Sequence, residues 1–423
     1  MSVSGSELRV TGGRPLRGRL QVPGDKSISH RALILGALAE GTSTVRGLSG
    51  GADAAATAAA VRAMGAEITG DRIAGGRPRL HPPAATIDVG NSGTTLRLLA
   101  GLCASMPWRT TLDGDASIRR RPMDRVAHPL RLMGGRLDGD RAPITVGGGA
   151  LSGIDYRLPV ASAQVKGAVL LAGLGAEGET VVRESAPTRA HTEEMLAACG
   201  ADIEVTDGGL TTRLRPGKLE PFELDVPGDP SQAAFWIVAA CIVPGSEVVV
   251  EGVYVGRARA GFVDVLRRMG ADLEVTMLDA TTADIAARTS WLHGTTVGGD
   301  EIPGLIDEIP ALAVAAAMAD GPTTFADAAE LAVKETDRIA AVAGELAALG
   351  AAVEATPDGL VVGGGRGLRG GAVSSRGDHR MAMALAVAAL AGEGAAVIDG
   401  WDAVATSYPG FADDLERLCR NGS

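Results

Sequence analysis

The chain has 423 residues, a length that exceeds one ordinary hydrophobic core and favours two domains. Its formal net charge of -11 disfavours nucleic acid as a partner of the whole surface, so any basic cluster must be a local site. Hydrophobic residues make up 46% of the chain but aromatic residues only 3%, so the core must be built from Ala, Val and Leu.

Neither the first residues nor the cysteines suggest secretion or a membrane. Residues 1–7 lack the basic stretch and the apolar run of a signal sequence, and no later run of about 18 apolar residues is free of charges or Gly. The cysteines form no CxxC or Cys/His metal spacing, which predicts reduced thiols. They are Cys103, Cys199, Cys241 and Cys419. We therefore expect a cytoplasmic protein without a membrane partner.

The first informative stretch is residues 22–31, with the sequence VPGDKSISHR, which an apolar run follows at once. The Pro-Gly pair predicts a turn, and Asp25 or Ser27 can cap a helix that the apolar run continues. Lys26, Ser27 and Arg31 then lie at a helix N-terminus, where free N–H groups and the helix dipole favour an anion. Taken alone, the pattern suits an ordinary solvated first turn equally well.

Similar helix starts recur along the chain. Polar turns with Gly, Ser or an acidic residue open apolar runs near Ser27, Ser92, Ser162, Ser231, Glu308 and His379, so one repeat is roughly 70 residues long. A second helix ends at a glycine in most repeats, at Gly65, Gly134, Gly200, Gly270 and Gly350. The first set is apolar nearly all round, which predicts buried central helices with sheets and amphipathic helices outside them.

The repeats fall into two halves. The tetrapeptide VPGD at residues 22–25 returns at residues 226–229, and an apolar helix follows each copy. This repeated tetrapeptide predicts that two similar domains start at these positions. We expect an α/β protein of two similar domains, one at residues 22–226 and the other at 227–423 with 1–21, each built from three repeats around buried helices.

Charged residues gather at the helix starts and in two expected loops, residues 119–123 and 334–338. Each group alone is typical of a solvated surface, but recurrence at equivalent positions indicates a shared cleft for several phosphate or carboxylate groups. The cations are Lys26, Arg31, Arg121, Lys334, Arg338 and Arg380. A Gly-bounded turn at residues 90–94 permits close approach of an anion to the backbone, and Asp307 and Glu308 open one helix with carboxylates.

Together these motifs closely resemble the 3-phosphoshikimate 1-carboxyvinyltransferase family, also called 5-enolpyruvylshikimate-3-phosphate synthase, among the enolpyruvyl transferases. The motifs are PGDKSISHR at 23–31, GNSGT at 90–94, RPM at 121–123, SAQ at 162–164, DE at 307–308, KETDR at 334–338 and DHRMAM at 378–383. They span essentially the whole chain in the family's order. The resemblance implies six βαβαββ repeats, three per domain, in an inside-out α/β barrel whose two domains close over the ligands.

The resemblance also implies an activity. Such an enzyme transfers the enolpyruvyl group of phosphoenolpyruvate to the 5-hydroxyl of shikimate 3-phosphate and releases phosphate through a tetrahedral intermediate. This reaction belongs to the shikimate pathway to chorismate and the aromatic amino acids, and the inhibitor glyphosate occupies the phosphoenolpyruvate site in this family. No metal or cofactor is required, and we expect a monomer.

Residue roles follow from the same resemblance. The implied catalytic residues are Asp307 and Glu335, as acid–base carboxylates, and Lys26, which contacts both substrates. Those implied to hold shikimate 3-phosphate are Lys26, Ser27, Arg31, Ser162, Ala163, Gln164 and Lys334. Those implied to hold phosphoenolpyruvate are Lys26, Gly93, Arg121, Gln164, Arg338 and Arg380.

Two positions depart from the family pattern, and two alternative functions stay open. Many members carry Lys where this chain has Thr406, and Asn is usual where it has Glu330. The sister transferase that acts on UDP-N-acetylglucosamine usually has a Cys in a mobile loop, whereas residues 114–125 contain none, and has Asn where this chain has Ser27. A non-catalytic anion-binding relative is the other alternative, which the intact catalytic set disfavours.

Overall fold

The computed structural model describes residues 2–365 and 367–422. The chain forms two compact units: unit 1 is Met1–Pro23 with Pro227–Ser423, and unit 2 is Gly24–Val226. Val22 and Pro23, which we expected at the start of the other domain, belong to unit 1. The reason is local bonding, since the N–H of Asp229 donates to the carbonyl of Pro23 at 2.9 Å.

All sheets in the described residues share one four-stranded pattern. The first two strands are parallel, and the third and fourth each run antiparallel to the strand before. Unit 2 holds the sheets β15-β4-β6-β5, β7-β8-β10-β9 and β11-β12-β14-β13, and unit 1 holds β3-β16-β18-β17, β19-β20-β22-β21 and β23-β24-β2-β1. This repetition confirms the six repeats that the sequence period predicted and the βαβαββ pattern that the family resemblance implied.

The strands are short. Those of unit 2 are β4 (Gly41–Arg46), β5 (Glu67–Thr69), β6 (Arg72–Gly75), β7 (Ile87–Asp88), β8 (Arg109–Asp113), β9 (Arg136–Asp138), β10 (Ile144–Gly147), β11 (Asp155–Arg157), β12 (Thr180–Arg183), β13 (Ile203–Thr206), β14 (Thr211–Leu214) and β15 (Glu223–Asp225). Those of unit 1 are β1 (Ser2–Ser4), β2 (Glu7–Thr11), β3 (Arg17–Gln21), β16 (Glu247–Tyr254), β17 (Asp272–Met277), β18 (Thr282–Arg288), β19 (Thr296–Val297), β20 (Thr323–Phe325), β21 (Val353–Thr356), β22 (Gly359–Val362), β23 (Ala372–Ser374) and β24 (Ala395–Asp399).

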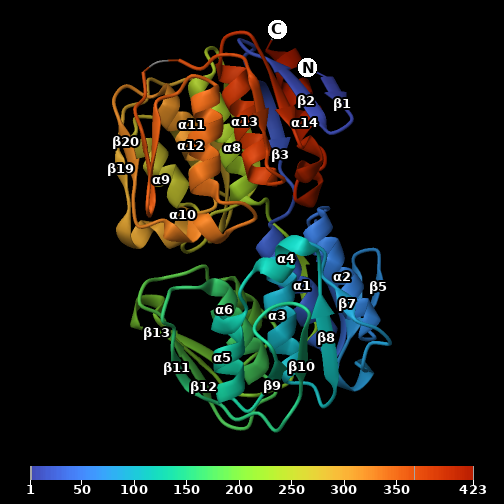
Figure 1. The fold of residues 1–423 in the computed structure, drawn as a ribbon. Coiled ribbons are helices and arrows are strands. Elements are labelled where there is room, and N and C mark those ends of the chain that lie inside the picture. The colour runs from blue at the N-terminus through green and yellow to red at the C-terminus, as the bar shows by residue number, and fades with distance from the viewer. Residues whose placement is uncertain (1, 366, 423) are drawn as a thin grey trace. The chain divides into compact units, whose positions relative to one another are not determined.

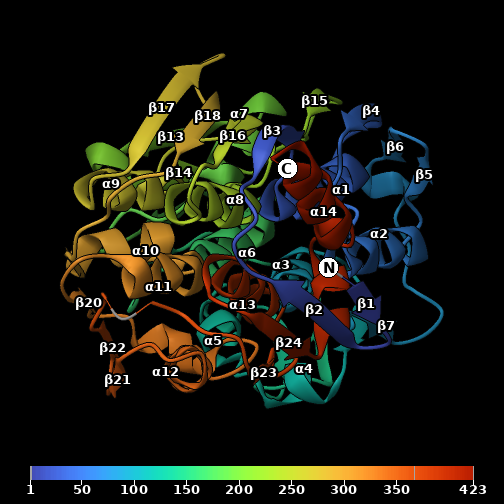
Figure 2. The same ribbon diagram turned by 90° about the horizontal axis from the view of Figure 1, so that it is seen from above.

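Three apolar helices form the centre of each unit. In unit 2 they are α1 (Lys26–Leu38), α3 (Gly93–Ala104) and α6 (Ala163–Gly173), and α3 packs against both of the others (Figure 1). In unit 1 they are α8 (Pro230–Ile242), α11 (Ile309–Met318) and α13 (His379–Ala391), which pack against one another (Figures 1 and 2). Nearly every side chain of these helices is buried, as their all-round apolar sequences predicted.

The remaining helices lie toward the outside or are short. They are α2 (Ala52–Ala63), α5 (Asp124–Leu132), α7 (His191–Ala198), α9 (Gly261–Arg268), α12 (Arg338–Ala348) and α14 (Phe411–Asn421), with the short α4 (Ala116–Arg120) and α10 (Ile302–Leu305). The glycine that ends α2 illustrates the expected stop: Gly65 has φ +106°, and the next N–H, of Ala66, bonds back to Val61 at 3.0 Å. No described helix has the length and apolar character needed to span a membrane.

Strands distant in sequence complete one sheet of unit 2 and two sheets of unit 1. In unit 2, β15 pairs in parallel with β4, nearly the whole unit earlier in the chain. In unit 1, the N-terminal β2 pairs antiparallel with β24, near the other end of the chain. In the same unit, β3 pairs in parallel with β16. The last strand of unit 2 thus joins the first repeat of that unit, whereas the N-terminal strands of unit 1 join its first and last repeats.

Candidate functional site

Apart from Arg121, the predicted site residues of unit 2 lie at the N-terminal ends of its three central helices. Each helix begins at a side-chain cap. The Asp25 carboxylate accepts from the N–H of Ile28 at 2.8 Å, and the Ser92 hydroxyl accepts from Thr95 at 3.2 Å. Ser162 caps α6 in the same way, and Ala163 is the first residue of that helix. These ends supply N–H groups and positive dipole ends suited to anions.

Two cations of α1 are fixed by neighbouring side chains. Lys26 Nζ lies 2.9 Å from Asp53 Oδ2, and both side chains are largely buried. Arg31 donates through Nε to the Thr192 hydroxyl at 2.7 Å and through Nη1 to the carbonyl of Ser27 at 2.9 Å. The positions of both cations are thus set before any ligand binds, which lowers the entropy lost on binding.

Two guanidinium groups lie against Gly93, the first residue of α3. A Cβ atom built on Gly93 would be 2.9 Å from Arg121 Nη1 and 2.8 Å from Arg97 Nη1. Arg97 also donates to Gln164 Oε1 at 2.7 Å, which ties α3 to α6. The glycine therefore leaves room for two cations that could bind one carboxylate or phosphate in bidentate fashion.

The expected charged loop at residues 119–123 is partly helical. Residues 116–120 form α4, because Asp115 caps it by accepting from the N–H of Ile118 at 2.8 Å. Arg121 directly follows this helix and donates to Asn91 Oδ1 at 3.3 Å. The prediction of a loop was wrong for Arg119 and Arg120, whereas Arg121 lies beside the Gly93 turn as a site residue should.

In unit 1, three cations surround the carboxylate of Asp307. Oδ1 lies 3.3 Å from Lys334 Nζ and 3.2 Å from Arg338 Nη1, and Oδ2 lies 3.7 Å from Arg380 Nη2. Arg380 also donates to the backbone carbonyl of Asp307 at 3.0 Å. These contacts fix the position and orientation of the Asp307 carboxylate beside three positive charges.

Arg338 is the most constrained of these cations. It begins α12, and its buried guanidinium also bonds Glu335 Oε2 at 2.7 Å and Asp378 Oδ2 at 2.8 Å. Burial would lower the pKa of Arg338, but the carboxylates of Asp378, Glu335 and Asp307 together raise it well above its ordinary value. The expected loop at 334–338 therefore ends in a helix whose first residue links all three carboxylates.

A helix cap is the alternative role for Asp307. The residue that caps α11 is Glu308, and its side chain makes no capping hydrogen bond. Instead, Glu308 Oε1 lies 3.0 Å from Arg259 Nη1 and accepts from the Ser231 hydroxyl, which connects α11 to α8. The geometry favours Asp307 as a group that faces cations over a capping role.

Several residues of this arrangement were not singled out from the sequence. They are Asp53, Arg97, Arg259 and Asp378. Arg97 and Asp378 stand inside or next to quoted motifs, so their charge near a helix start was an available signal. Asp53 and Arg259 meet the site only through tertiary packing. The two departing positions, Glu330 and Thr406, lie in short 3₁₀ segments, Ala329–Val333 and Trp401–Thr406.

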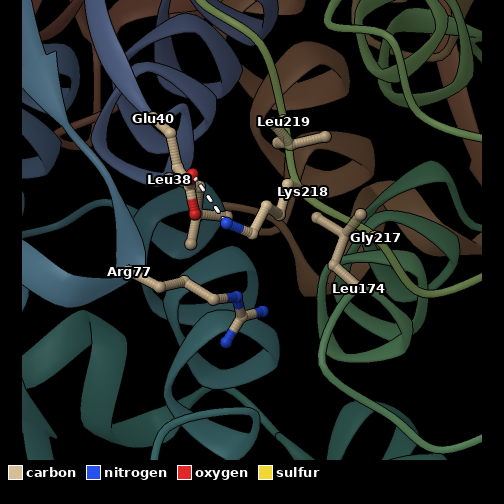
Figure 3. A pocket seen from close by; sticks show the side chains of 7 residues that line it. All are labelled: Leu38, Glu40, Arg77, Leu174, Gly217, Lys218 and Leu219. Atoms are coloured by element: carbon tan, nitrogen blue, oxygen red, sulfur yellow. Dashed lines mark hydrogen bonds and ion pairs between the residues drawn. The ribbon is translucent and has the colours of Figure 1, made fainter.

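A small hollow elsewhere in unit 2 is not part of this site. It is lined by Leu38, Glu40, Arg77, Leu174, Gly217, Lys218 and Leu219 (Figure 3). Leu38 ends α1 and Leu174 follows α6, so the hollow lies at the helix ends opposite to the capped starts. Arg77 donates to the carbonyl of Ser105, where α3 ends, at 3.3 Å. Because the helix dipole favours a cation at a helix C-terminus, it explains why Arg77 lies at the end of α3.

Comparison with known proteins identifies the family. A family model described as EPSP synthase (3-phosphoshikimate 1-carboxyvinyltransferase) matches residues 10–415. The chain belongs to the EPSP synthase family. A 3-phosphoshikimate 1-carboxyvinyltransferase of Pelotomaculum thermopropionicum is 49% identical over 97% of this chain and 99% of its own length. One of Synechococcus sp. is 50% identical over 98% of this chain and 97% of its own length.

A solved structure of a family member has a similar fold. An EPSP synthase of Acinetobacter baumannii matches with a TM-score of 0.85 and 42% sequence identity, over 97% of this chain and 98% of that one. The two-domain α/β class predicted from the EPSP synthase motifs is confirmed by this match and by the six repeated sheets.

Proposed function

We propose that the protein transfers the enolpyruvyl group of phosphoenolpyruvate to the 5-hydroxyl of shikimate 3-phosphate and releases phosphate. The observation that carries this proposal is the set of three cations around Asp307, in a chain that matches EPSP synthases over nearly its whole length. Relatives with about half of their residues identical carry the name of this reaction.

The chemistry needs groups of the kinds found in the two clusters. The 5-hydroxyl must lose a proton as its oxygen attacks C2 of phosphoenolpyruvate, while C3 gains a proton. A tetrahedral ketal phosphate results, and the reverse proton movement at C3 expels phosphate. We assign Asp307 and Glu335 to these proton transfers and Lys26 to contact with both substrates. No step in this sequence requires a redox change.

Binding roles follow the placement of the cations. We assign shikimate 3-phosphate to the capped starts of α1 and α6 with Lys334, through Lys26, Ser27, Arg31, Ser162, Ala163, Gln164 and Lys334. We assign phosphoenolpyruvate to Lys26, Gly93, Arg121, Gln164, Arg338 and Arg380. Arg97 joins the second group because it lies as close to Gly93 as Arg121 does.

The cysteines favour this function over that of the sister transferase. All four are free and buried, and burial raises the pKa of Cys103, Cys199 and Cys241 to about 12. None of these three thiols is a nucleophile near neutral pH. Buried reduced thiols also agree with our proposal of a cytoplasmic enzyme, which we further propose acts as a monomer.

One assay tests the proposal. The protein is mixed with shikimate 3-phosphate and phosphoenolpyruvate, and free phosphate is measured over time. A parallel reaction replaces shikimate 3-phosphate with UDP-N-acetylglucosamine. We expect phosphate release only in the first mixture. Release in the second alone would identify the sister activity, and release in neither, with folded protein, would favour a non-catalytic anion-binding relative.

A further inference from the structure

Four buried polar side chains form a continuous hydrogen-bonded chain in unit 2. His30 Nδ1 lies 2.6 Å from the Thr57 hydroxyl, which lies 2.7 Å from the Thr95 hydroxyl. Thr95 donates in turn to the Ser92 hydroxyl at 2.7 Å. All four residues are 0% exposed. Because burying polar groups is costly, such a chain is retained only where each member is satisfied by the next.

The chain connects three helix starts that carry site residues. His30 lies on α1 one turn after Lys26, and Thr57 lies on α2 one turn after Asp53, the partner of Lys26. Thr95 stands in the first turn of α3, two residues after Gly93, and its hydroxyl lies 3.4 Å from the carbonyl of Asp53. Displacing any one of these helices would therefore break a short hydrogen bond.

The direction of these hydrogen bonds indicates which ring nitrogen of His30 carries a proton. Since Thr95 gives its proton to Ser92, Thr57 must donate to Thr95, and His30 must then donate through Nδ1 to Thr57. The Nε2 atom of His30 has no hydrogen-bond partner among the described residues, so a proton on it would be buried without an acceptor. Burial lowers the pKa of His30 to about 3, which agrees with a ring that stays neutral.

We propose that the chain His30–Thr57–Thr95–Ser92 is a positioning device that sets the Lys26–Asp53 pair relative to the Gly93 turn. In the proposed reaction, on which this inference rests, Lys26 contacts both substrates and Gly93 faces phosphoenolpyruvate. The four residues act through these groups. Misplacing reacting groups by about 1 Å can lower a rate by a factor on the order of 100, so the chain should affect kcat more than KM.

The test removes one hydroxyl and then restores it. Thr57→Val keeps the shape of the side chain but breaks the hydrogen-bonded chain, and Thr57→Ser restores the hydroxyl. Thr180→Val is the matched control, because Thr180 in β12 is equally buried and its hydroxyl has no partner among the described residues. We expect Thr57→Val to lower kcat about tenfold to a hundredfold, with KM values changed less than about threefold. Thr57→Ser should recover most of the rate, and Thr180→Val should keep it.

Two results would overturn the proposal: unchanged kcat in folded Thr57→Val, or Thr57→Ser no better than Thr57→Val. A readout independent of turnover separates this inference from the proposed function. With 15N-labelled histidine, of which the chain has six, His30 should show a neutral ring protonated at Nδ1, assigned by its loss in His30→Asn. The Thr57→Val change should shift that signal. If that signal does not move, the proposed hydrogen-bonded chain is contradicted, whether or not the wild type releases phosphate.

Discussion

Asp307 and Arg338 form an ion pair, with 3.2 Å between Oδ1 and Nη1, in which the arginine is buried and the carboxylate is partly exposed. The guanidinium is held on its other edges by Glu335 and Asp378, so it cannot follow Asp307 if that side chain moves. The Asp307 side chain, by contrast, is 15% exposed, so part of its surface can be reached from solvent. This asymmetry suits a group that exchanges a proton while its counter-charge stays fixed.

Replacing Asp307 with Asn should abolish the proton-transfer role and keep most of the shape. We expect turnover to fall by a factor on the order of 100 to 10,000, while affinity for shikimate 3-phosphate stays near that of the wild type. Phosphate release and calorimetric titration measure the two quantities. Asp264→Asn is the control, because Asp264 is 77% exposed on α9 and pairs only loosely with Arg267 at 3.9 Å. Wild-type turnover in Asp307→Asn would reduce Asp307 to a structural role.

A second prediction concerns a buried ion cluster in unit 2. Lys166 Nζ lies 2.5 Å from Glu184 and 2.8 Å from Glu193, and all three side chains are at most 2% exposed. Lys166→Met removes the cation that both carboxylates contact, so we expect the free energy of unfolding to fall by about 3–5 kcal/mol. Urea unfolding followed by circular dichroism measures this change.

The control for that experiment is a lysine pair of the same length at the surface. Lys218 Nζ lies 2.9 Å from Glu40 but its side chain is 79% exposed. Lys218→Met should change stability by less than about 1 kcal/mol, because solvent screens an exposed pair. Equal losses for the two variants would contradict the buried cluster as a source of stability.

Much of the fold could be predicted because the chain repeats itself. The starts of all six central helices and the glycines after the outer helices were readable from local patterns, since caps and left-handed glycines are set by neighbours in sequence. The expected domain boundary was two residues too early, at Val22 and Pro23. The repeated VPGD sequence marks where the chain passes from one unit to the other, but it does not show to which unit each residue is hydrogen-bonded. Only tertiary contacts assign those two residues.

The residues of the candidate site were easier to predict from the sequence than the partners with which they form ion pairs and hydrogen bonds. Cations at helix starts were visible in the sequence, but their partners were not: Asp53 reaches Lys26 from another helix, and Asp378 reaches Arg338 across 40 residues. The hydroxyl chain from His30 to Ser92 carries no charge pattern, so nothing in the sequence distinguished Thr57 from any other helical threonine. Such contacts depend on how the helices pack.

A third prediction follows from the neutral state of His30. Burial is the main reason that the pKa of His30 is lowered to about 3. The nearby Lys26 and Arg31 lower it further, and Asp53 opposes the shift. The unfolded chain has a His pKa of about 6.5, so between these values the unfolded state binds more protons and stability falls as the pH falls. We expect the stability difference between wild type and His30→Asn to decline between about pH 6.5 and pH 4.

Urea unfolding at a series of pH values measures that difference. The decline should approach about 1.4 kcal/mol per pH unit below the unfolded pKa. His128→Asn, at an exposed position on α5, is the control for the effect of replacing a histidine as such. A wild type that gains stability over His30→Asn as the pH falls would mean that His30 is protonated in the folded protein.

The last prediction concerns Gly93 and glyphosate, which in this family occupies the phosphoenolpyruvate site and is longer than that substrate. A methyl group on Gly93 would lie 2.8 Å from Arg97 Nη1 and 2.9 Å from Arg121 Nη1. Both atoms end flexible side chains, so the guanidinium groups can withdraw by a few tenths of an ångström. Glyphosate should lose more than the shorter substrate, because its extra length fills the space that the methyl group takes. Overpacking typically costs about 1–3 kcal/mol, or roughly tenfold to a hundredfold in affinity.

We therefore expect wild-type protein to be inhibited by glyphosate in competition with phosphoenolpyruvate, and Gly93→Ala to raise the inhibition constant about tenfold to a hundredfold. The KM for phosphoenolpyruvate should rise as well, but less, since Arg121 is one of its proposed ligands. Gly410→Ala is the control, because a Cβ atom there meets nothing within 4 Å. Steady-state kinetics on the three proteins gives both constants. If the two constants rise equally in Gly93→Ala, or neither changes, Gly93 does not line the phosphoenolpyruvate site.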